Sequence, residues 1–309
     1  MRAVQFHQFG GIDVLSLEDV AQPEPGPGQV LVHVVCAALN PGDSRIRRGE
    51  AQDLMPTTFP SGQGFELAGV VVDLGAGVDG VGVDDAVLAL APRRAQADFV
   101  TVDAEMMLPK PDSLGWAVAS CIPSLASTSY AAINAVRPKT DETVVVSAAA
   151  GGVGTILTQL VVATGAHVIA TASPANFDFL AQLGATPVAH GAGLTERIRQ
   201  LAPDGVDAYF DNFGHGNVAT AITLGVSPER INTIADPQAA RDYGTHAAGL
   251  TDALSSTVWA DLVDKVLSQQ VTIPIHALYP LTQVQAAYAE LDSHHARGKI
   301  VLSLQQIDH

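Results

Sequence analysis

The sequence predicts an α/β protein of two domains, a small and mostly antiparallel β-barrel followed by a doubly wound parallel sheet. Three observations support this. The chain has 309 residues, more than one compact core usually organises. Short strand-like runs and turns fill residues 1 to about 118. From about residue 119 strands alternate with helix-like stretches, the rhythm of a parallel sheet.

The first part of the chain is rich in strands. The runs at 1–6, 29–39 and 66–78 are strand-like, and Pro and Gly residues at 23–28 indicate a turn. No crossover helices separate these runs. A mostly antiparallel barrel is therefore favoured over a parallel sheet.

The second part alternates regularly. Strands are predicted at 142–148, 166–173, 185–190 and 205–214, and helices at 151–165, 175–184 and 195–203. Glycines at 165 and 184 end the first two helices. Strand–helix–strand repeats of this length predict a right-handed, doubly wound parallel sheet.

The last part returns to a mixed pattern. Residues 250–270 have helical periodicity, and 297–304 form a closing strand that we expect to rejoin the first domain. The predicted organisation is thus a catalytic domain over 1–118, a cofactor domain over 119–250, and a segment over 251–309 that completes the catalytic domain.

Composition excludes several classes of function. A net charge of −16 argues against nucleic-acid or anionic-membrane surfaces as partners. Two cysteines, Cys36 and Cys121, give no disulfide framework and predict a reducing, cytoplasmic environment. The first residues lack the apolar run of a signal peptide, and no stretch of about 18 apolar residues predicts a membrane span.

A small-residue turn follows the first strand of the second part. Its spacing, Ala149-x-Gly151-x-x-Gly154, is a variant of the dinucleotide fingerprint with Ala at the first glycine. A turn there, at the start of a helix, can hold a diphosphate with backbone N–H groups and the helix dipole. A tight turn without a ligand is the alternative.

The end of the next strand bears on the choice of cofactor. An NAD-selective site usually has Asp or Glu there to hold the ribose hydroxyls, but Thr171, Ala172 and Ser173 occupy the region. The absence of a carboxylate permits a 2′-phosphate and hence NADPH. Ser173 and Asn176 can donate hydrogen bonds to it, and His190, at the end of the third strand, is expected beside them.

Taken together, these residues resemble the zinc-independent medium-chain dehydrogenases/reductases, the quinone oxidoreductase-like family. The resemblance runs nearly end to end. It rests on Asn40-Pro41-Gly42-Asp43, on 64–71 (GFELAGVV), on 127–130 (STSY), on Ala149 to Gly154, on 205–207 (GVD) with Asp211-Asn212, and on 297–301 (RGKIV).

The resemblance implies a GroES-like β-barrel catalytic domain and a Rossmann cofactor domain, with NADPH in a cleft between them, and a homodimer. It also implies most of the residues expected around the cofactor: Asn40, Thr128, Ala150, Gly151, Gly152, Val153, Ser173, Asn212 and Lys299. Asn176 and His190 join this set from their positions after the strand ends, not from the resemblance.

The same resemblance argues against a catalytic metal. Asn40 and Phe65 stand where zinc-dependent relatives have a Cys and a His, and neither side chain can replace those ligands. Without a Lewis acid, conjugated acceptors such as quinones and α,β-unsaturated carbonyls (enones) are easier to reduce than simple ketones, because the developing charge is delocalised. We expect Asn40, and Arg45 from a loop, to stabilise that charge as catalytic residues.

The chain departs from the family at several positions. Arg45 stands where quinone reductases often have Tyr, Ala51 where they have a second aromatic residue, and His190 where Tyr is common. Two alternatives to a quinone or enone reductase therefore stay open. One is an enoyl-thioester reductase, and the other is a non-catalytic NADP(H)-binding redox sensor.

Overall fold

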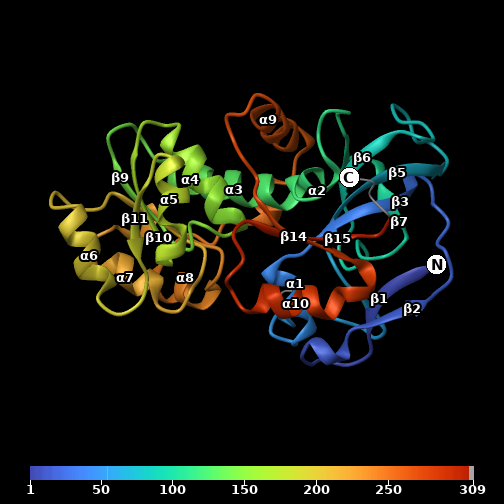
Figure 1. Ribbon diagram of the computed structural model, residues 1–309, viewed down its shortest axis with the longest axis horizontal. Helices are drawn as coiled ribbons and strands as arrows, with labels where there is room; N and C mark the ends of the chain where they lie inside the picture. The colour runs from blue at the N-terminus through green and yellow to red at the C-terminus, as the bar shows by residue number, and fades with distance from the viewer. Residues whose placement is uncertain (54, 306–309) are drawn as a thin grey trace. The chain divides into compact units, whose positions relative to one another are not determined.

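The described part of the chain, residues 1–53 and 55–305 of a computed structural model, divides into two units (Figure 1). Unit 1 comprises 1–124, 255–267 and 274–309, and unit 2 comprises 125–254 and 268–273. The domain boundaries expected from the sequence, at about residues 118 and 250, are not tested by this division and remain predictions.

Unit 1 is built on two β-sheets. Its smaller sheet has the order β2-β1-β4, and its larger sheet the order β14-β15-β3-β5-β6-β8 with β7 also on β3. Pairing is antiparallel except between β14 and β15. The strands are β1 (Arg2–Phe6), β2 (Ser16–Asp19), β3 (Gln29–Ala38), β4 (Ser61–Gly62), β5 (Glu66–Leu74), β6 (Ala86–Leu90), β7 (Phe99–Asp103), β8 (Met107–Pro109), β14 (Ile275–Pro280) and β15 (Lys299–Ser303).

Strand β3 is the centre of unit 1 because it is long and apolar on nearly every residue. Its first half pairs with β7 and its last three residues pair with the closing strand β15, while β5 runs along its length. The closing strand β15 therefore joins a sheet whose other strands, apart from β14, all come from the first 109 residues. Among its described residues this unit also contains the helices α1 (Pro41–Arg47), α2 (Trp116–Ala119), α9 (Ser256–Leu267) and α10 (Val284–Asp292).

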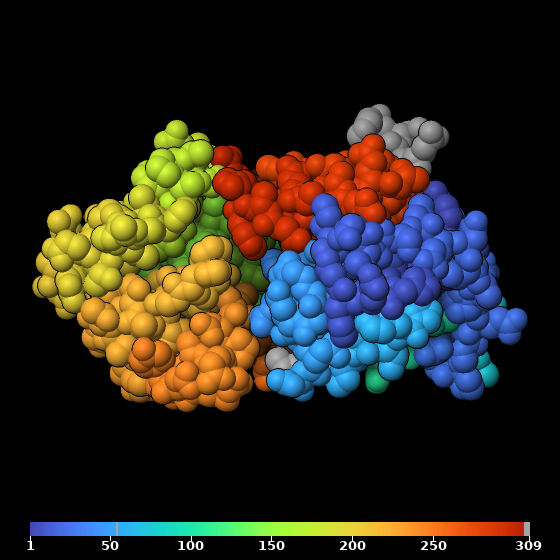
Figure 2. All heavy atoms as spheres, turned by 90° about the horizontal axis from the view of Figure 1, so that it is seen from below, coloured from blue at the N-terminus to red at the C-terminus, as the bar shows by residue number. Residues whose placement is uncertain are grey.

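The C-terminal segment also packs against the N-terminal one. Figure 2 shows the red segment beside the blue residues, and Gln285 Nε2 on α10 donates to Leu15 O at 2.8 Å. Tyr288 of the same helix is fully buried in the hydrophobic core of unit 1.

Unit 2 contains a five-stranded parallel sheet within the described residues, in the order β11-β10-β9-β12-β13. The chain starts in the middle, moves outward on one side and then crosses to the other, so the order reverses between β9 and β12. In doubly wound sheets ligands bind at such a switch point, outside the carboxyl ends of the strands. The strands are β9 (Thr143–Val146), β10 (His167–Ala172), β11 (Thr186–Ala189), β12 (Ala208–Asp211) and β13 (Ile231–Thr233).

Helices connect successive strands: α4 (Gly152–Val162), α5 (Phe177–Gln182), α6 (Leu194–Leu201) and α7 (Asn217–Thr223). Helix α3 (Ile122–Val136) leads into the sheet, and α8 (Pro237–Tyr243) follows its last strand. Two apolar clusters contain side chains from alternate positions of the central strand. Val144 and Val146 belong to one of them, and Val145 to the other. A central parallel strand is buried on both faces, which explains its uninterrupted run of valines.

The expected elements need three corrections. Arg45, predicted in a loop, lies in helix α1, because Asn40 precedes a helix with Pro at its first position and an acid in its first turn. The helix expected over 250–270 is a short 3₁₀ turn at Leu250–Ala253 followed by α9. Helix α3 and strand β13 were not expected at all.

Candidate functional site

The glycine turn after β9 has the geometry of a phosphate-holding turn. Gly151 is the N-cap of α4, and its φ of −75° is ordinary. An α-helix leaves its first N–H groups without intrahelical partners, here those of Gly152 and Val153, and both residues are only partly buried. A Cβ at Gly151 would meet Ala148 O at 3.3 Å and no other atom within 4 Å. These features suit a diphosphate.

Gly154 has a different role, inside the turn. A Cβ there would lie 2.2 Å from Ala148 O and 2.8 Å from Ala149 Cα, so only glycine lets α4 pack this closely on the end of β9. The turn is also held by the neighbouring strand: Thr171 O accepts from Ala149 N at 3.0 Å. Ala148 has a φ of 45°, a left-handed conformation that is rare outside glycine.

Three predicted residues follow the carboxyl ends of the two neighbouring strands. Ser173 comes directly after β10, and Asn176 Nδ2 donates to its Oγ at 3.1 Å. His190 comes directly after β11, is exposed, and donates its backbone N–H to Ala172 O at 3.3 Å. The expectation that His190 lies beside the end of the second strand is thus met by the backbone.

A cation that the sequence did not suggest also reaches this corner. Arg197, on α6, folds its guanidinium over the loop after β11 and donates to Ala189 O at 2.8 Å and to Ala192 O at 2.8 Å. It lies seven residues beyond His190, too far along the chain to be grouped with it by spacing. The loop that follows β11, next to His190, therefore carries a positive charge.

Asn212 is held by Ser147, which is held in turn by a buried carboxylate. Its Nδ2 donates to Ser147 O at 2.9 Å, next to the glycine turn. The preceding residue, Asp211, is fully buried. Asp211 Oδ1 accepts from Ser147 Oγ at 3.0 Å, and Asp211 Oδ2 accepts from Thr233 Oγ1 at 2.7 Å. Asp211 thereby joins β9, β12 and β13 at the switch point.

Thr128, also of unit 2, lies on α3 and is almost fully buried.

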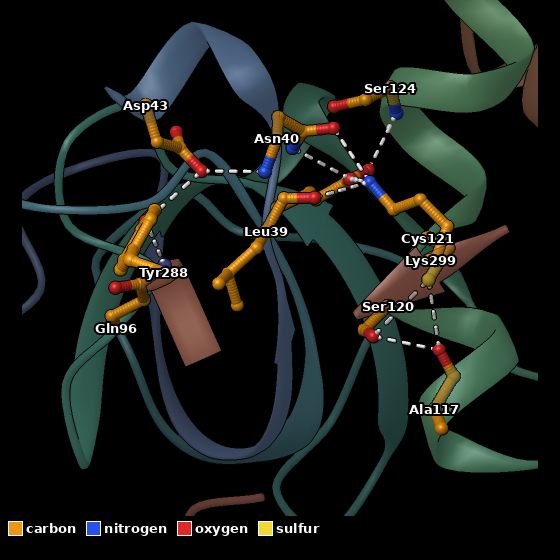
Figure 3. A network of polar contacts seen from close by, with 11 residues as sticks. Leu39, Asn40, Asp43, Gln96, Ala117, Ser120, Cys121, Ser124, Tyr288 and Lys299 are labelled. Atoms are coloured by element: carbon orange, nitrogen blue, oxygen red, sulfur yellow. Dashed lines mark hydrogen bonds and ion pairs between the residues drawn. The ribbon is translucent and has the colours of Figure 1, made fainter. Parts of the chain in front are cut away.

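In unit 1, Asn40 and Lys299 lie side by side (Figure 3), and both donate hydrogen bonds to Glu66. Asn40 follows the end of β3, Glu66 begins β5 and Lys299 begins β15. Lys299 Nζ donates to Asn40 Oδ1 at 2.6 Å and to Glu66 Oε1 at 3.0 Å, while Asn40 Nδ2 donates to the same Glu66 oxygen at 3.0 Å. Burial is the largest influence and disfavours the ammonium, but the attraction and hydrogen bond of Glu66, with smaller contributions from Cys121 and Asp43, together hold the pKa of Lys299 above its ordinary value.

Asp43 belongs to a second buried network, visible on the left of Figure 3. Asp43 Oδ2 accepts from Asn40 N at 2.8 Å and from the hydroxyl of Tyr288 at 3.2 Å. That hydroxyl accepts from Gln96 Nε2 at 2.8 Å. Burial raises the pKa of Asp43 from 3.8 to about 7, despite the hydrogen bond from Asn40. Arg47 lies over the Tyr288 ring, 5.0 Å from its centroid.

This pKa predicts the pH dependence of stability. The folded protein holds the Asp43 proton more tightly than the unfolded chain, so this contribution is complete below about pH 4 and is lost as pH rises through about 7. In urea unfolding, we expect the free energy of unfolding of Asp43→Asn, relative to that of the parent protein, to rise by about 2–3 kcal/mol between pH 5 and pH 8.5.

Asp98→Asn is the control of opposite sign. Burial alone would raise the pKa of Asp98, but hydrogen bonds from Arg2 hold that pKa below its ordinary value. The stability from Asp98 is thus present at neutral pH and is lost in acid. An Asp43→Asn protein whose stability relative to the parent does not change between pH 5 and pH 8.5 would show that Asp43 is ionised throughout.

The remaining predicted residue is Arg45, on helix α1, which begins directly after Asn40. Phe65 packs against the hydrophobic core of unit 1. Across residues 1–53 and 55–305, no group of three or more His, Cys, Asp or Glu side chains is arranged to hold a metal ion.

Cys36 and Cys121 are buried free thiols, and burial raises the pKa of each to about 12. None of the described helices has the length and apolarity that crossing a membrane requires.

Comparison with known proteins places this arrangement in a family. Residues 26–116 match the alcohol dehydrogenase GroES-like domain, and residues 152–228 match the zinc-binding dehydrogenase domain. The structure is similar to that of the quinone oxidoreductase from Coxiella burnetii, with a TM-score of 0.86 and 28% identity over 99% of both chains. The chain belongs to the quinone oxidoreductase-like family of the medium-chain dehydrogenases/reductases.

Two further members of this superfamily bear on chemistry. The NADPH-dependent alkenal/one oxidoreductase of Arabidopsis thaliana chloroplasts is 28% identical over 98% of this chain and 79% of the relative. A mycobacterial protein solved with NADPH has a TM-score of 0.87 and 26% identity over 98% of this chain and 100% of the other. This quinone oxidoreductase-like chain is thus an NAD(P)H-dependent oxidoreductase of the quinone reductase or alkenal reductase type, and the predicted GroES-like and Rossmann fold class is confirmed.

The residues that sequence analysis missed as site residues are Glu66, Asp211, Tyr288 and Arg197. Glu66 and Asp211 carried a signal, because each is a lone acid beside an apolar strand segment and a buried carboxylate requires partners. Tyr288 and Arg197 carried no such signal, because the residues that each one contacts are brought near it only by the fold.

Proposed function

We propose that the protein is a zinc-free, NADPH-dependent reductase of quinones or α,β-unsaturated carbonyls. The observation that carries this proposal is the Asn40 site of unit 1. A half-buried amide, held by a buried ammonium and a buried carboxylate, stands where zinc-dependent relatives have a metal ligand. An amide N–H can stabilise a delocalised negative charge but is a weaker electrophile than a metal ion. Conjugated acceptors are the substrates that such a site suits.

The proposed cofactor is NADPH, which supplies a hydride when bound. The residues of unit 2 fit it: the backbone N–H groups of Gly152 and Val153 at the start of α4 suit the diphosphate, with Ala150 and Gly151 in the same turn. Ser173, Asn176 and His190 offer hydrogen bonds near the ribose, and Arg197 adds a positive charge that a 2′-phosphate would favour. Thr128 and Asn212 stay proposed cofactor contacts.

Arg45 stays a proposed substrate contact, since its helix begins directly after Asn40. Lys299 was expected at the cofactor, but its three donors are already used within unit 1. We therefore assign Lys299 to the orientation of Asn40. A homodimer and a cytoplasmic location stay predictions from the sequence.

Oxidation of NADPH and NADH by the purified protein tests the proposal. The acceptors are benzoquinone, a naphthoquinone, a short enone, a crotonyl thioester and a simple ketone as control. We expect turnover of quinones or enones with NADPH, much less with NADH, no turnover of the ketone, and no effect of a chelator. Turnover of the ketone, or loss of activity with the chelator, would contradict the proposal.

The same panel separates the alternatives. Preference for the crotonyl thioester would favour an enoyl-thioester reductase. Tight NADPH binding without turnover of any acceptor would favour a redox sensor.

A further inference from the structure

The buried ammonium of Lys299 has no donor left for a ligand. It is 4% exposed, and its Nζ donates to Leu39 O at 2.8 Å, to Asn40 Oδ1 at 2.6 Å and to Glu66 Oε1 at 3.0 Å. Three bonds are the full capacity of an ammonium group. Any effect of Lys299 on chemistry must therefore pass through the groups it holds.

Its partners determine which way the Asn40 amide faces. An ammonium can only donate, so the atom beside Lys299 must be Asn40 Oδ1. The ionised Glu66 carboxylate can only accept, so the atom beside it must be Asn40 Nδ2. The opposite orientation would place a donor against a donor and an acceptor against an acceptor. Glu66 is itself fixed, because its Oε2 accepts from Ser124 N at 2.8 Å.

One hydrogen of the Asn40 amide is then left over. The amide nitrogen carries two N–H groups, and Glu66 accepts from one of them. Within residues 1–53 and 55–305 no acceptor is seen for the second. Asn40 is half-buried, whereas Lys299 and Glu66 are almost fully buried. The free N–H is therefore the part of this cluster that a ligand can reach.

We propose that Lys299 and Glu66 are positioning residues: both orient the Asn40 amide and Lys299 also polarises it, so that its second Nδ2–H binds the substrate oxygen on which negative charge develops. This inference rests on the proposed function. In enone reduction, hydride from NADPH bonds to the β-carbon, the C=C electron pair shifts to form an enolate, and solvent later protonates the α-carbon, giving the saturated ketone and NADP⁺. Asn40 is the residue that would touch the enolate oxygen.

The electrostatic logic follows from the charges. A cation on Oδ1 draws electron density from the amide and makes its N–H groups stronger donors, and low solvent access strengthens the effect. The donor is also held in place before the reaction, so little reorganisation is needed as charge develops. A fixed ammonium acting through an amide thus replaces part of what a metal ion supplies elsewhere.

The first test needs neither cofactor nor substrate. In the ¹⁵N-labelled ligand-free protein, the Asn40 side-chain amide is assigned by its loss in Asn40→Ala. We expect its ¹⁵N and ¹H resonances to shift upfield in Lys299→Met, because polarisation is lost. The matched control is Lys110→Met, since Lys110 is another buried lysine of unit 1 and donates to Pro111 O and Leu114 O. It should leave the Asn40 resonances in place. Unchanged resonances in Lys299→Met would overturn the proposal.

The second test is a double-mutant cycle on kcat. We expect Asn40→Ala to lower kcat for an enone by about 10²–10³-fold, the usual loss for one donor to an oxyanion. Lys299→Met should lower kcat with little change in the KM for NADPH, and should cause no further loss in the Asn40→Ala background. Equal losses in both backgrounds would mean that Lys299 acts independently of Asn40, against the proposal.

Two outcomes keep this inference separate from the proposed function. If the parent protein reduces no quinone or enone, the proposed function fails, while the resonance shifts still report whether Lys299 polarises Asn40. If Lys299→Met does not fold, the double variant Glu66→Gln/Lys299→Met, which removes both charges, replaces it. We again expect the Asn40 resonances to shift upfield, and unchanged resonances would overturn the proposal.

Discussion

Gly154→Ala is expected to destabilise the protein by about 3 kcal/mol or more, because the new Cβ would overlap backbone atoms. It would lie 2.2 Å from Ala148 O and 2.8 Å from Ala149 Cα, and neither atom can move away like a side-chain end. Relief requires α4 to shift from β9, which opens the packed turn. Thermal unfolding should show a fall in Tm of roughly 6–12 °C.

Gly151→Ala is the matched control three residues away. Its backbone φ is ordinary, and its Cβ would meet only Ala148 O at 3.3 Å. We expect nearly unchanged Tm, but at least tenfold weaker NADPH binding in a fluorescence titration, because the methyl group occupies space that the diphosphate needs. A folded, stable Gly154→Ala protein, or a Gly151→Ala protein with parental NADPH affinity, would show that the turn does not work as described.

The second large effect is expected at the buried ion pair of unit 1. Lys299→Met leaves the Glu66 carboxylate, which is 0% exposed, without its counter-charge. Removing one partner of a buried pair typically costs about 3–5 kcal/mol, because the other charge stays buried and uncompensated. Urea unfolding at neutral pH should show a loss of this size.

Two comparisons make the second effect specific. Glu66→Gln/Lys299→Met removes both charges and should recover much of the loss, since Gln can still accept from Ser124 N. Lys110→Met removes an ammonium held by backbone carbonyls rather than by a carboxylate, so it should cost less. If the double variant is no more stable than Lys299→Met, uncompensated charge is not the cause of the loss.

Local patterns in the sequence predicted most of the parallel sheet. The valine run at 144–146, the small residues at 149–154 and the terminal glycines at 165 and 184 are short-range signals, and β9 and β10 lie where they indicated. The start of α1 was also legible, because Asn40, Pro41 and Asp43 form a helix-start pattern. Placing Arg45 in a loop overlooked that signal.

The partners within the site could not be predicted in this way. Lys299 and Glu66 are 233 residues apart, and Arg47 and Asp292 are 245 apart. Their pairing depends on β15 lying against β3 and on α10 packing against α1. A buried acid such as Glu66 signals that a cation must lie nearby, but only the fold identifies Lys299 as that cation. Arg197 is similar, since its guanidinium reaches the loop after β11 only because α6 folds back.

Isotope transfer tests the central claim most directly. The metal-free protein is incubated with NADPH carrying deuterium at C4 of the nicotinamide, separately in each of the two stereochemical positions, and with a short enone in ordinary water. The account predicts a saturated ketone with one deuterium on its β-carbon, from one of the two labelled cofactors only. Product without deuterium from either cofactor, or product that forms only after a metal ion is added, would contradict it.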